Sequence, residues 1–262
     1  MSDNFTEFDG VRIQRRDQVL HVTLANPAHR NAQSPATWRR LASVESYVTD
    51  EVRAVVLTGE GLSFCAGLDR RMLSPEGIEG EESLISRASS ESAKIDEFIT
   101  IFQSAFTWWS ETPAITVAAV QGHAIGAGFQ LALACDLIVA ADNALFAMRE
   151  TSLGLVPDLT GTSRLVKRVG YSKALEICST GRFVDADEAV RIGIALSAVP
   201  LEELGHHTDT VVASLMTAPA GAVRELKSLL RAAEVNSPAE QHRAERVAQA
   251  NRFADLNAAM EG

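Results

Sequence analysis

Apolar residues recur along this chain in short continuous runs that predict β-strands. Val52–Thr58 and Ile115–Val120 are mostly unbroken apolar runs rich in β-branched residues, a pattern typical of strands buried on both faces of a sheet. Val11–Ile13 and Val19–Leu24 are separated by a polar turn at Arg15–Gln18, and together they predict a hairpin. Further strands are predicted at Leu137–Ala140, Ala144–Ala147 and Leu196–Val199.

Segments with helical periodicity alternate with these strands. Ser34 followed by Pro35 is a typical helix start and predicts a helix over Thr37–Val48. Aromatic and aliphatic residues at helical spacing predict another helix over Lys94–Trp109. The polar stretch between residues 73 and 92 predicts a mobile insertion. Other helices are predicted at Phe129–Cys135, Arg164–Val169, Ser172–Thr180, Asp185–Arg191 and from Glu202 to the end.

Two of the predicted strands lead into glycine-rich turns followed by helical sequence. The strand at Ile115–Val120 is followed by glycines 122, 126 and 128, and the strand at Val52–Thr58 by glycines 59, 61 and 67. The first amides of a helix have no intrahelical partner and carry the positive end of the helix dipole, so such a turn suits an oxygen that gains negative charge. Close packing of helix on sheet is the alternative explanation of one such turn. The second copy favours a functional site.

The alternation of strands and helices predicts an α/β fold with an accessory helical region. The repeated strand, glycine turn and helix units indicate a layered α/β core over residues 1–200. Residues 201–262 are predicted to be helical, with apolar stripes that must be buried, and a neighbouring subunit is the expected partner.

Composition restricts the classes of partner. The net charge of −10 opposes the nonspecific attraction to phosphate on which binders of nucleic acid or anionic membranes rely. Three scattered cysteines, with spacing suited to neither zinc nor a disulfide framework, are expected of a cytoplasmic protein. The polar, acidic N-terminus is unlike a signal peptide, and no apolar run has the ~20 residues of a membrane span. Nucleotide-binding P-loop, serine-hydrolase elbow and compact metal motifs are absent from the sequence.

The two glycine turns and two acids suggest acid/base chemistry beside a carbonyl group. If the amides of Leu68 and Ala127 converge, they could hold one oxygen as it becomes negative. A carboxylate is then needed to move a proton, and Glu150 and Asp158 in one predicted loop are the candidates. Both acids could instead be ordinary surface charges. Asp69 could simply cap a helix.

The chain resembles the enoyl-CoA hydratase/isomerase (crotonase) superfamily over roughly residues 10 to 256. The resemblance is carried by several segments together: PAHRNA at 27–32, AVVLTGEGLSFCAGLD at 54–69, PAITVAAVQGHAIGAGFQLALACDLIVAADNALF at 113–146, RETSLGLVPDLTGTSRL at 149–165 and TGRFVDADEAVRIGIALSAV at 180–199. This family implies a crotonase-like spiral of ββα units, a C-terminal helical trimerisation region and a homotrimer or a dimer of trimers.

The resemblance also implies an acyl-CoA thioester substrate whose carbonyl lies between the amides of Leu68 and Ala127. Coenzyme A would enter as part of the substrate, with no separate cofactor and no metal. Glu150 and Asp158 take the catalytic acid positions. The implied substrate-binding residues are Ala28, Arg30, Ala66, Gly67, Asp69, Ile125, Gly126 and Gln130.

Two positions depart from the hydratase pattern of the family. The second acid of hydration falls on Gln130, whose amide cannot give or take a proton at neutral pH. Asp158 matches an aspartate of the dienoyl-CoA isomerase branch, although the third acid of that branch also falls on position 130. We therefore expect an isomerase of an unsaturated acyl-CoA. A hydratase, another enolate reaction and a non-catalytic acyl-CoA-binding protein are the alternatives.

The C-terminus departs from the family as well. Many relatives continue into a basic helix that helps to cover the phosphates of CoA, whereas this sequence ends at Glu261-Gly262. The phosphates are then expected to rely on Arg30, Arg70, Arg71 or basic residues of a neighbouring subunit.

Overall fold

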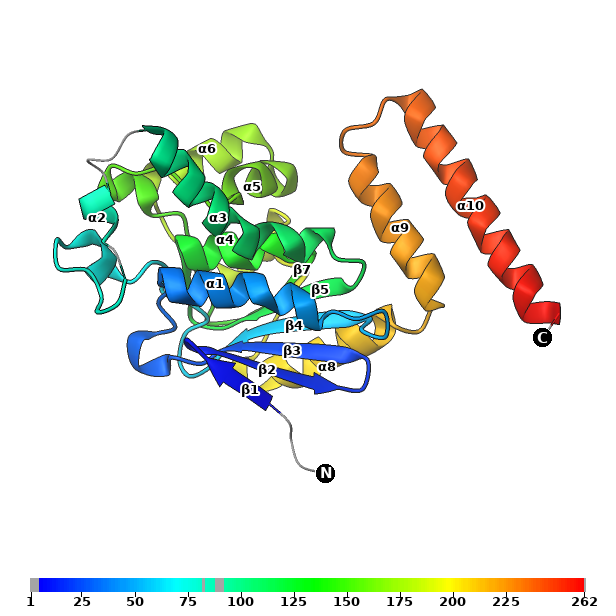
Figure 1. Cartoon of the computed structure of the whole chain (residues 1–262), viewed down its shortest axis with the longest axis horizontal. Coiled ribbons are helices and arrows are strands. Elements are labelled where there is room, and N and C mark those ends of the chain that lie inside the picture. The colour runs from blue at the N-terminus through cyan, green and yellow to red at the C-terminus, as the bar shows by residue number, and fades with distance from the viewer. Residues whose placement is uncertain (1–4, 82, 88–91, 262) are drawn as a thin grey trace.

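A seven-stranded sheet lies at the centre of the computed structural model, which describes residues 5–81, 83–87 and 92–261 (Figure 1). The strands are adjacent in the order β1-β2-β3-β4-β5-β7-β10. β1 to β3 pair in an antiparallel arrangement, and the pairs from β3 to β10 are parallel. Their bounds are β1 Phe5–Phe8, β2 Val11–Arg16, β3 Val19–Leu24, β4 Ala54–Gly59, β5 Ile115–Val120, β7 Leu137–Ala141 and β10 Ser197–Val199.

The parallel pairing of β4 and β5 brings both glycine turns to one edge of the sheet. Ala54 lies opposite Ile115 and Leu57 opposite Ala118, so the two chains leave the sheet side by side. Because the carboxyl ends of parallel strands meet at the same edge, residues 60–69 and 121–130 become neighbours. The sheet thus positions the segments that were predicted to form a site.

A second, three-stranded sheet stands at this edge. It contains β6 (His123–Ile125), β8 (Leu145–Ala147) and β9 (Val184–Asp185), and β6 runs parallel to β8. The predicted single turn between β5 and the next helix is therefore wrong. Gly122 and Gly126 have positive φ angles of 56° and 52° and bend the chain on either side of β6, whose partner is distant in sequence.

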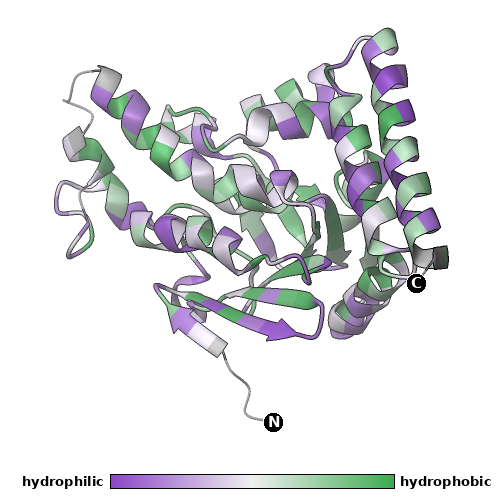
Figure 2. Ribbon diagram, turned by 45° about the vertical axis from the view of Figure 1, so that its right-hand side comes forward, coloured by the Kyte–Doolittle hydropathy of each residue, from purple (hydrophilic) through white to green (hydrophobic). Residues whose placement is uncertain are grey.

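Helices cover both faces of the large sheet. One core packs α1 (Pro35–Ser43), α3 (Ser92–Glu111) and α4 (Ala127–Ala134) on one face, and contains the buried rings of Trp108, Phe106 and Phe129. The other face is lined by small and β-branched residues, and Leu204 and Val212 of α8 (Leu204–Leu215) pack against it. In Figure 2 the central strands are accordingly among the most hydrophobic segments.

Most predicted elements are present, with differences at their ends. The helix expected over residues 37–48 is α1 followed by a 3-10 helix at Val44–Tyr47, and α1 begins with reciprocal hydrogen bonds between Ser34 and Thr37. Strand β1 was not predicted, because its four residues, FTEF, are too few to show an alternating or continuous apolar pattern. The helices after residue 160 are α5 Gly161–Val169, α6 Tyr171–Thr180, α7 Ala186–Arg191, α9 Ala220–Ala232 and α10 Pro238–Glu261.

The segment predicted as a mobile insertion contains ordered contacts in its described part. A 3-10 helix at Arg70–Leu73 leads into it, and the short helix α2 (Leu84–Arg87) lies within it. The Ser83 hydroxyl is buried and donates to the backbone oxygen of Ser74 at 2.6 Å. Residues 82 and 88–91 lie outside the described part of the chain.

The C-terminal helices divide into two groups. α8 belongs to the core of the sheet, whereas α9 and α10 pair with each other beyond the sheet (Figure 1). The α/β fold class and the helical C-terminus are confirmed, and the domain boundary at residue 200 stays a prediction. No helix of residues 5–81, 83–87 or 92–261 combines the length and the apolar character needed to cross a membrane.

Candidate active site

The segments after β4 and β5 run side by side at the sheet edge. The Cys65 amide donates to the His123 oxygen at 2.8 Å, and the Ile125 amide donates to the Cys65 oxygen at 3.0 Å. These two bonds are the pattern of a parallel ladder. They hold residues 66–68 beside residues 125–127, where the predicted pair of amides lies.

Neighbouring hydrogen bonds determine the direction of the Leu68 amide. The Gln33 amide donates to the Gly67 oxygen at 2.7 Å, and the Asp69 amide donates to the Gln33 oxygen at 2.8 Å. In extended backbone, the N–H of the intervening residue points to the opposite side. The N–H of Leu68 therefore points away from Gln33. Leu68 lines the cavity described below.

The Ala127 amide is directed by the start of a helix. Ala127 is the first residue of α4, so its N–H has no acceptor within the helix and lies at the positive end of the helix dipole. Ala127 lines the same cavity as Leu68. The two amides can therefore serve one oxygen atom in that cavity.

Glycine is required for this close approach. A Cβ atom at Gly67, whose φ is +91°, would lie 2.5 Å from the Ile125 oxygen. A Cβ atom at Gly128 would lie 2.5 Å from the Cys65 oxygen. Real Cβ atoms do not come this close to backbone, so any side chain at either position would force the two segments apart.

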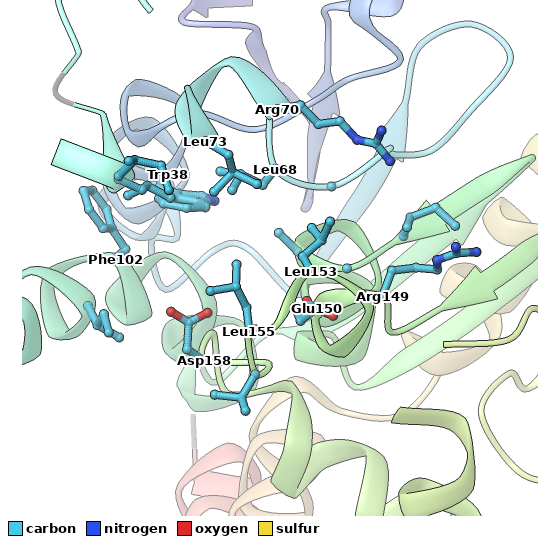
Figure 3. A pocket seen from close by; sticks show the side chains of 18 of the residues that line it. Trp38, Leu68, Arg70, Leu73, Phe102, Arg149, Glu150, Leu153, Leu155 and Asp158 are labelled. Carbon is cyan, nitrogen blue, oxygen red and sulfur yellow. The ribbon is translucent and has the colours of Figure 1, made fainter. Parts of the chain in front are cut away.

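A cavity of about 490 Å³ opens in front of the two amides. In Figure 3, Arg70 and Arg149 lie at one end, and Trp38 and Phe102 lie at the other. The aromatic end is apolar and is contributed by α1, α2, α3 and the 3-10 helix after Asp69. Its lining includes Trp38, Leu73, Leu84, Ile85, Ile95, Phe98, Ile99 and Phe102.

Glu150 lines the cavity and has a partly buried carboxyl group. It begins a 3-10 helix at Glu150–Leu153, and its Oε1 accepts a hydrogen bond of 2.8 Å from Nε2 of Gln130. Its Oε2 is buried and has no hydrogen-bond partner within the described chain. Burial raises the pKa of Glu150 above the usual value, and the hydrogen bond from Gln130 opposes this shift. A raised pKa suits a group that must both take and return a proton.

Asp158 lines the same cavity as Glu150. The residue is exposed, yet nearby protein partly desolvates its carboxyl group, and this desolvation raises its pKa. The negative charge of Asp158 also contributes to the raised pKa of Glu150. The backbone oxygen of Asp158 is held by Nε2 of Gln103 at 2.7 Å, which connects its turn to α3.

Gln130 lies behind the two acids. Its side chain is buried in α4, and it lines neither the cavity nor the neighbouring hollow. Its amide nitrogen donates to Glu150, and its Oε1 accepts from the backbone amides of Leu159 and Gly161 at 2.9 and 3.1 Å. Gln130 therefore contacts both acid-bearing segments from α4.

A second hollow of about 480 Å³ continues from the polar end of the cavity. Arg30, Arg70 and Arg149 line it, as do the predicted substrate-binding residues Ala66 and Ile125. The hollow is therefore positively charged, although the whole chain is acidic. Three cations at one mouth suit the phosphates of a nucleotide.

Several residues of this hollow were missed in the sequence. Arg149 lies with its guanidinium 5.5 Å from the ring centre of Phe183, and both residues line the hollow together with His123 and Ser152. His123 Nδ1 lies 3.2 Å from the Ser63 hydroxyl. In the sequence, the one feature that could have indicated this hollow is the basic residue Arg149, which directly precedes Glu150.

Besides Gln130, three residues considered for binding lie outside both openings. Ala28 is exposed in a 3-10 helix at Pro27–His29, and neither it nor Asp69 lines the cavity or the hollow. Asp69 caps the next 3-10 helix and forms an ion pair with Arg71 at 2.7 Å. The Arg71 charge is thus already paired. Among the described residues, no group of three His, Cys, Asp or Glu side chains could hold a metal ion.

Comparison with known proteins identifies the family. A family model described as enoyl-CoA hydratase/isomerase matches residues 14–261. The chain belongs to the enoyl-CoA hydratase/isomerase family. A Rhodobacter capsulatus protein named "Probable enoyl-CoA hydratase" is 32% identical over 222 residues, which cover 85% of this chain and 81% of the relative.

Solved structures of this family superpose on the chain. A Thermobifida fusca YX protein, assigned as an enoyl-CoA hydratase, was crystallised with acetoacetyl-CoA and shares 41% identity and a TM-score of 0.90. That match covers 94% of this chain and 95% of the other. The same protein in complex with CoA gives a TM-score of 0.89 and covers 95% of each chain. The crotonase fold and an acyl-CoA-related family are therefore established for this chain.

Proposed function

We propose that this enoyl-CoA hydratase/isomerase family member shifts the double bond of an unsaturated acyl-CoA, with Glu150 and Asp158 moving the proton. The observation that carries the proposal is the presence of two carboxyl groups with raised pKa values in one cavity that also contains the Leu68 and Ala127 amides. Hydrogen-bond donors aimed at a developing oxyanion contribute ~10²–10³-fold each. The pair would favour formation of an enolate.

The proton balance of a 3-enoyl-CoA substrate follows from these roles. Glu150 as carboxylate takes a proton from C2, and the electrons move into a dienolate whose oxygen accepts from the two amides. Asp158 as carboxylic acid gives a proton to C4, which leaves the double bond between C2 and C3. Transfer of one proton from Glu150 back to Asp158 restores the starting state. Burial raises the pKa of both acids, and the charge of Asp158 raises that of Glu150 further, which favours retention of a proton, as this cycle requires.

The two openings suggest how the substrate lies. The arginine-lined hollow suits the nucleotide of CoA, and the cavity between the acids and the aromatic residues suits the acyl chain. The apolar lining near Trp38 and Phe102 favours an aliphatic acyl group without polar substituents beyond the double bond. Metal and separate cofactor have no part in this proposal.

Water addition to a 2-enoyl-CoA is the second candidate. It is favoured by the names of the relatives, several of which are described as hydratases. Against it stands the amide at Gln130, which cannot supply the second acid or base of hydration. A positioned acid or base contributes ~10²–10⁴-fold, so ordinary hydratase activity should be weak.

Product analysis distinguishes the two reactions. The protein is incubated with 3-enoyl-, 3,5-dienoyl- and 2-enoyl-CoA. The products are separated, and their molecular masses are measured by mass spectrometry. We expect isomers of unchanged mass from the first two, with ~10²–10⁴-fold losses for Glu150→Gln and Asp158→Asn. Addition of water that survives Asp158→Asn and disappears with Glu150→Gln would instead support a hydratase. Binding of CoA thioesters with no turnover would indicate a non-catalytic member.

A further inference from the structure

Gln130 is the buried connection between the two acid-bearing segments. Its side chain is 1% exposed, and each of its polar atoms contacts a segment near the cavity. The amide nitrogen reaches Glu150, and the carbonyl oxygen reaches the backbone that directly follows Asp158. A single side chain of α4 therefore holds both acids.

The orientation of the Gln130 amide is determined by its surroundings. Oε1 accepts from two backbone N–H groups, Leu159 and Gly161, which can only donate. The NH₂ group must consequently face Glu150, where it donates at 2.8 Å. Gly161 packs directly on the side chain, because a Cβ atom there would lie 2.5 Å from Gln130 Cγ. The amide has little room to turn.

This arrangement makes the two oxygens of Glu150 unequal. Oε1 accepts the hydrogen bond from Gln130, whereas Oε2 is buried without a partner within the described residues. An oxygen that already accepts an N–H is the poorer site for a proton. The hydrogen bond from Gln130 therefore stabilises the charged carboxylate and orients it. The Gln130 carbonyl oxygen, with both lone pairs engaged, is also unable to accept from an attacking water molecule.

We propose that Gln130 is a positioning residue for proton transfer: it fixes the Glu150 carboxyl group through Oε1 and ties the Asp158 turn to α4. The proposal rests on Glu150 acting as the base of the proposed function. It assigns a role to the very side chain that departs from the hydratase pattern. The amide at position 130 fixes Glu150 as the single base, and it cannot itself act as a second acid.

Glu150 has other charged and titratable neighbours that any pH experiment must consider. Across or beside the cavity these are Asp158, Arg70 and Arg149, and on α6 there is Cys178, whose pKa is raised by burial and by Glu150. None of them changes in a Gln130 variant. A shift of the pH profile on substitution of Gln130 thus reports the lost contact with Glu150.

The test compares the pH profiles of Gln130→Met, Gln130→Glu and a matched control. In wild type, the rising limb of kcat/KM with pH reports ionisation of Glu150. Gln130→Met removes the donor, so we expect the limb to move to higher pH by about one to two pH units and the lost activity to return at high pH. Gln130→Glu should move it further, since two carboxylates in contact cannot both ionise.

The control is Gln121→Met, which removes another buried glutamine whose Nε2 donates to the Gly59 and Gly61 oxygens, away from the acids. We expect its limb to coincide with that of wild type. A limb that stays in place for both Gln130→Met and Gln130→Glu, with activity reduced equally at every pH, would overturn the proposal. Should Gln130→Met fail to fold, the nearly isosteric Gln130→Glu decides alone.

The profile is measured with any acyl-CoA that wild type converts, so a hydratase outcome would refute the proposed function without touching the role of Gln130. If no substrate is converted, a double-mutant cycle of Gln130→Met and Glu150→Gln is measured by urea unfolding between pH 5 and 8. Coupling that grows as pH rises supports the contact, because the donor stabilises the charged carboxylate. Absence of coupling at every pH contradicts it.

Discussion

At the scale of single residues, Glu150 lies in an environment that opposes its charge. Surrounding protein desolvates its carboxyl group, Oε2 lacks a partner within the described chain, and Asp158 adds a negative charge nearby. The desolvation and the charge of Asp158 raise its pKa, and hydrogen bonds from the backbone of Glu150, from Gln130 and from the backbone of Arg149 oppose this shift. Such conditions reduce stability and are typical of a group retained for chemistry.

Glu150→Gln is expected to stabilise the protein in a pH-dependent way. Because the folded-state pKa of Glu150 is raised, the folded state binds the proton more tightly, and stability falls as pH rises from the unfolded value of about 4.3 through the folded pKa. The gain from Glu150→Gln should therefore be largest at alkaline pH and disappear near pH 4. Thermal unfolding between pH 4 and 9 measures it.

The exposed carboxylate of Glu202 provides the control for that experiment. Glu202→Gln should leave the unfolding temperature close to that of wild type across the range. A Glu150→Gln variant that is less stable than wild type at pH 8, or whose difference does not depend on pH, would contradict the assigned environment.

The acids and the glycine turns of the site could be predicted from nearby sequence, whereas the residues that surround them in space could not. Glu150, Asp158 and the turns at Leu68 and Ala127 stand next to glycine and apolar patterns that can be read along the chain. The arginine-lined hollow, in contrast, joins Arg149 to Phe183 and residues far away in sequence. No spacing rule connects them. The contacts of Gln130 are equally remote from any local pattern.

At the scale of elements, the site depends on close packing of α4 against the segment after β4. Gly128 lies one residue beyond Ala127, and a Cβ atom at this position would lie 2.5 Å from the Cys65 oxygen and 2.7 Å from the Cys65 Cβ. Both Cys65 and Gly128 are buried, so neither segment has space to yield. The distance between the two amides is therefore sensitive to side-chain size here.

Gly128→Ala is expected to lower kcat while the protein remains folded. Moving α4 away from residue 65 separates the Leu68 and Ala127 amides, and loss of one effective donor costs ~10²–10³-fold. KM should change less, because the hollow for the nucleotide is elsewhere. Steady-state kinetics on the isomerised substrate, with circular dichroism to verify folding, measures the effect.

Gly205→Ala is the matched control, because Gly205 lies in α8 and a Cβ atom there meets nothing within 4 Å. Its activity should equal that of wild type. Full activity in Gly128→Ala would show that the two amides do not act together as described.

Elements with a strong local pattern were predicted well, and those that depend on distant partners were not. The apolar runs of β4 and β5 and the helical periods of α3 and α6 are expressed within each segment. β6 has three residues and exists through pairing with β8 and contact with residue 65. Pairing of this kind leaves no local signal, so a turn was predicted where a strand forms.

At the scale of the whole molecule, the helices α9 and α10 leave an apolar surface uncovered. Leu226 and Leu230 on α9 are 54% and 63% exposed, and Phe253 and Leu256 on α10 are 58% and 59% exposed. The contacts of the pair with the rest of the chain include the packing of Val223 on the core and the partly buried ion pair of Lys227 with Asp136 at 2.6 Å. A large exposed apolar surface favours association.

We expect the chain to assemble as a trimer or a dimer of trimers through this surface. Sedimentation equilibrium should give three or six times the chain mass of 28.2 kDa. The double variant Leu226→Glu, Leu230→Glu should shift the distribution to smaller species, because charges replace apolar contacts between subunits. A monomer for wild type at micromolar concentration, or a variant that assembles like wild type, would contradict this prediction.

The central claim is that Glu150 removes a proton beside a thioester carbonyl held by the Leu68 and Ala127 amides. Incorporation of solvent deuterium at C2 of an acyl-CoA in D₂O, followed by mass spectrometry, tests it most directly. We predict that wild type exchanges this position and that Glu150→Gln exchanges it ~10²–10⁴-fold more slowly. Exchange at the wild-type rate in Glu150→Gln would contradict the account.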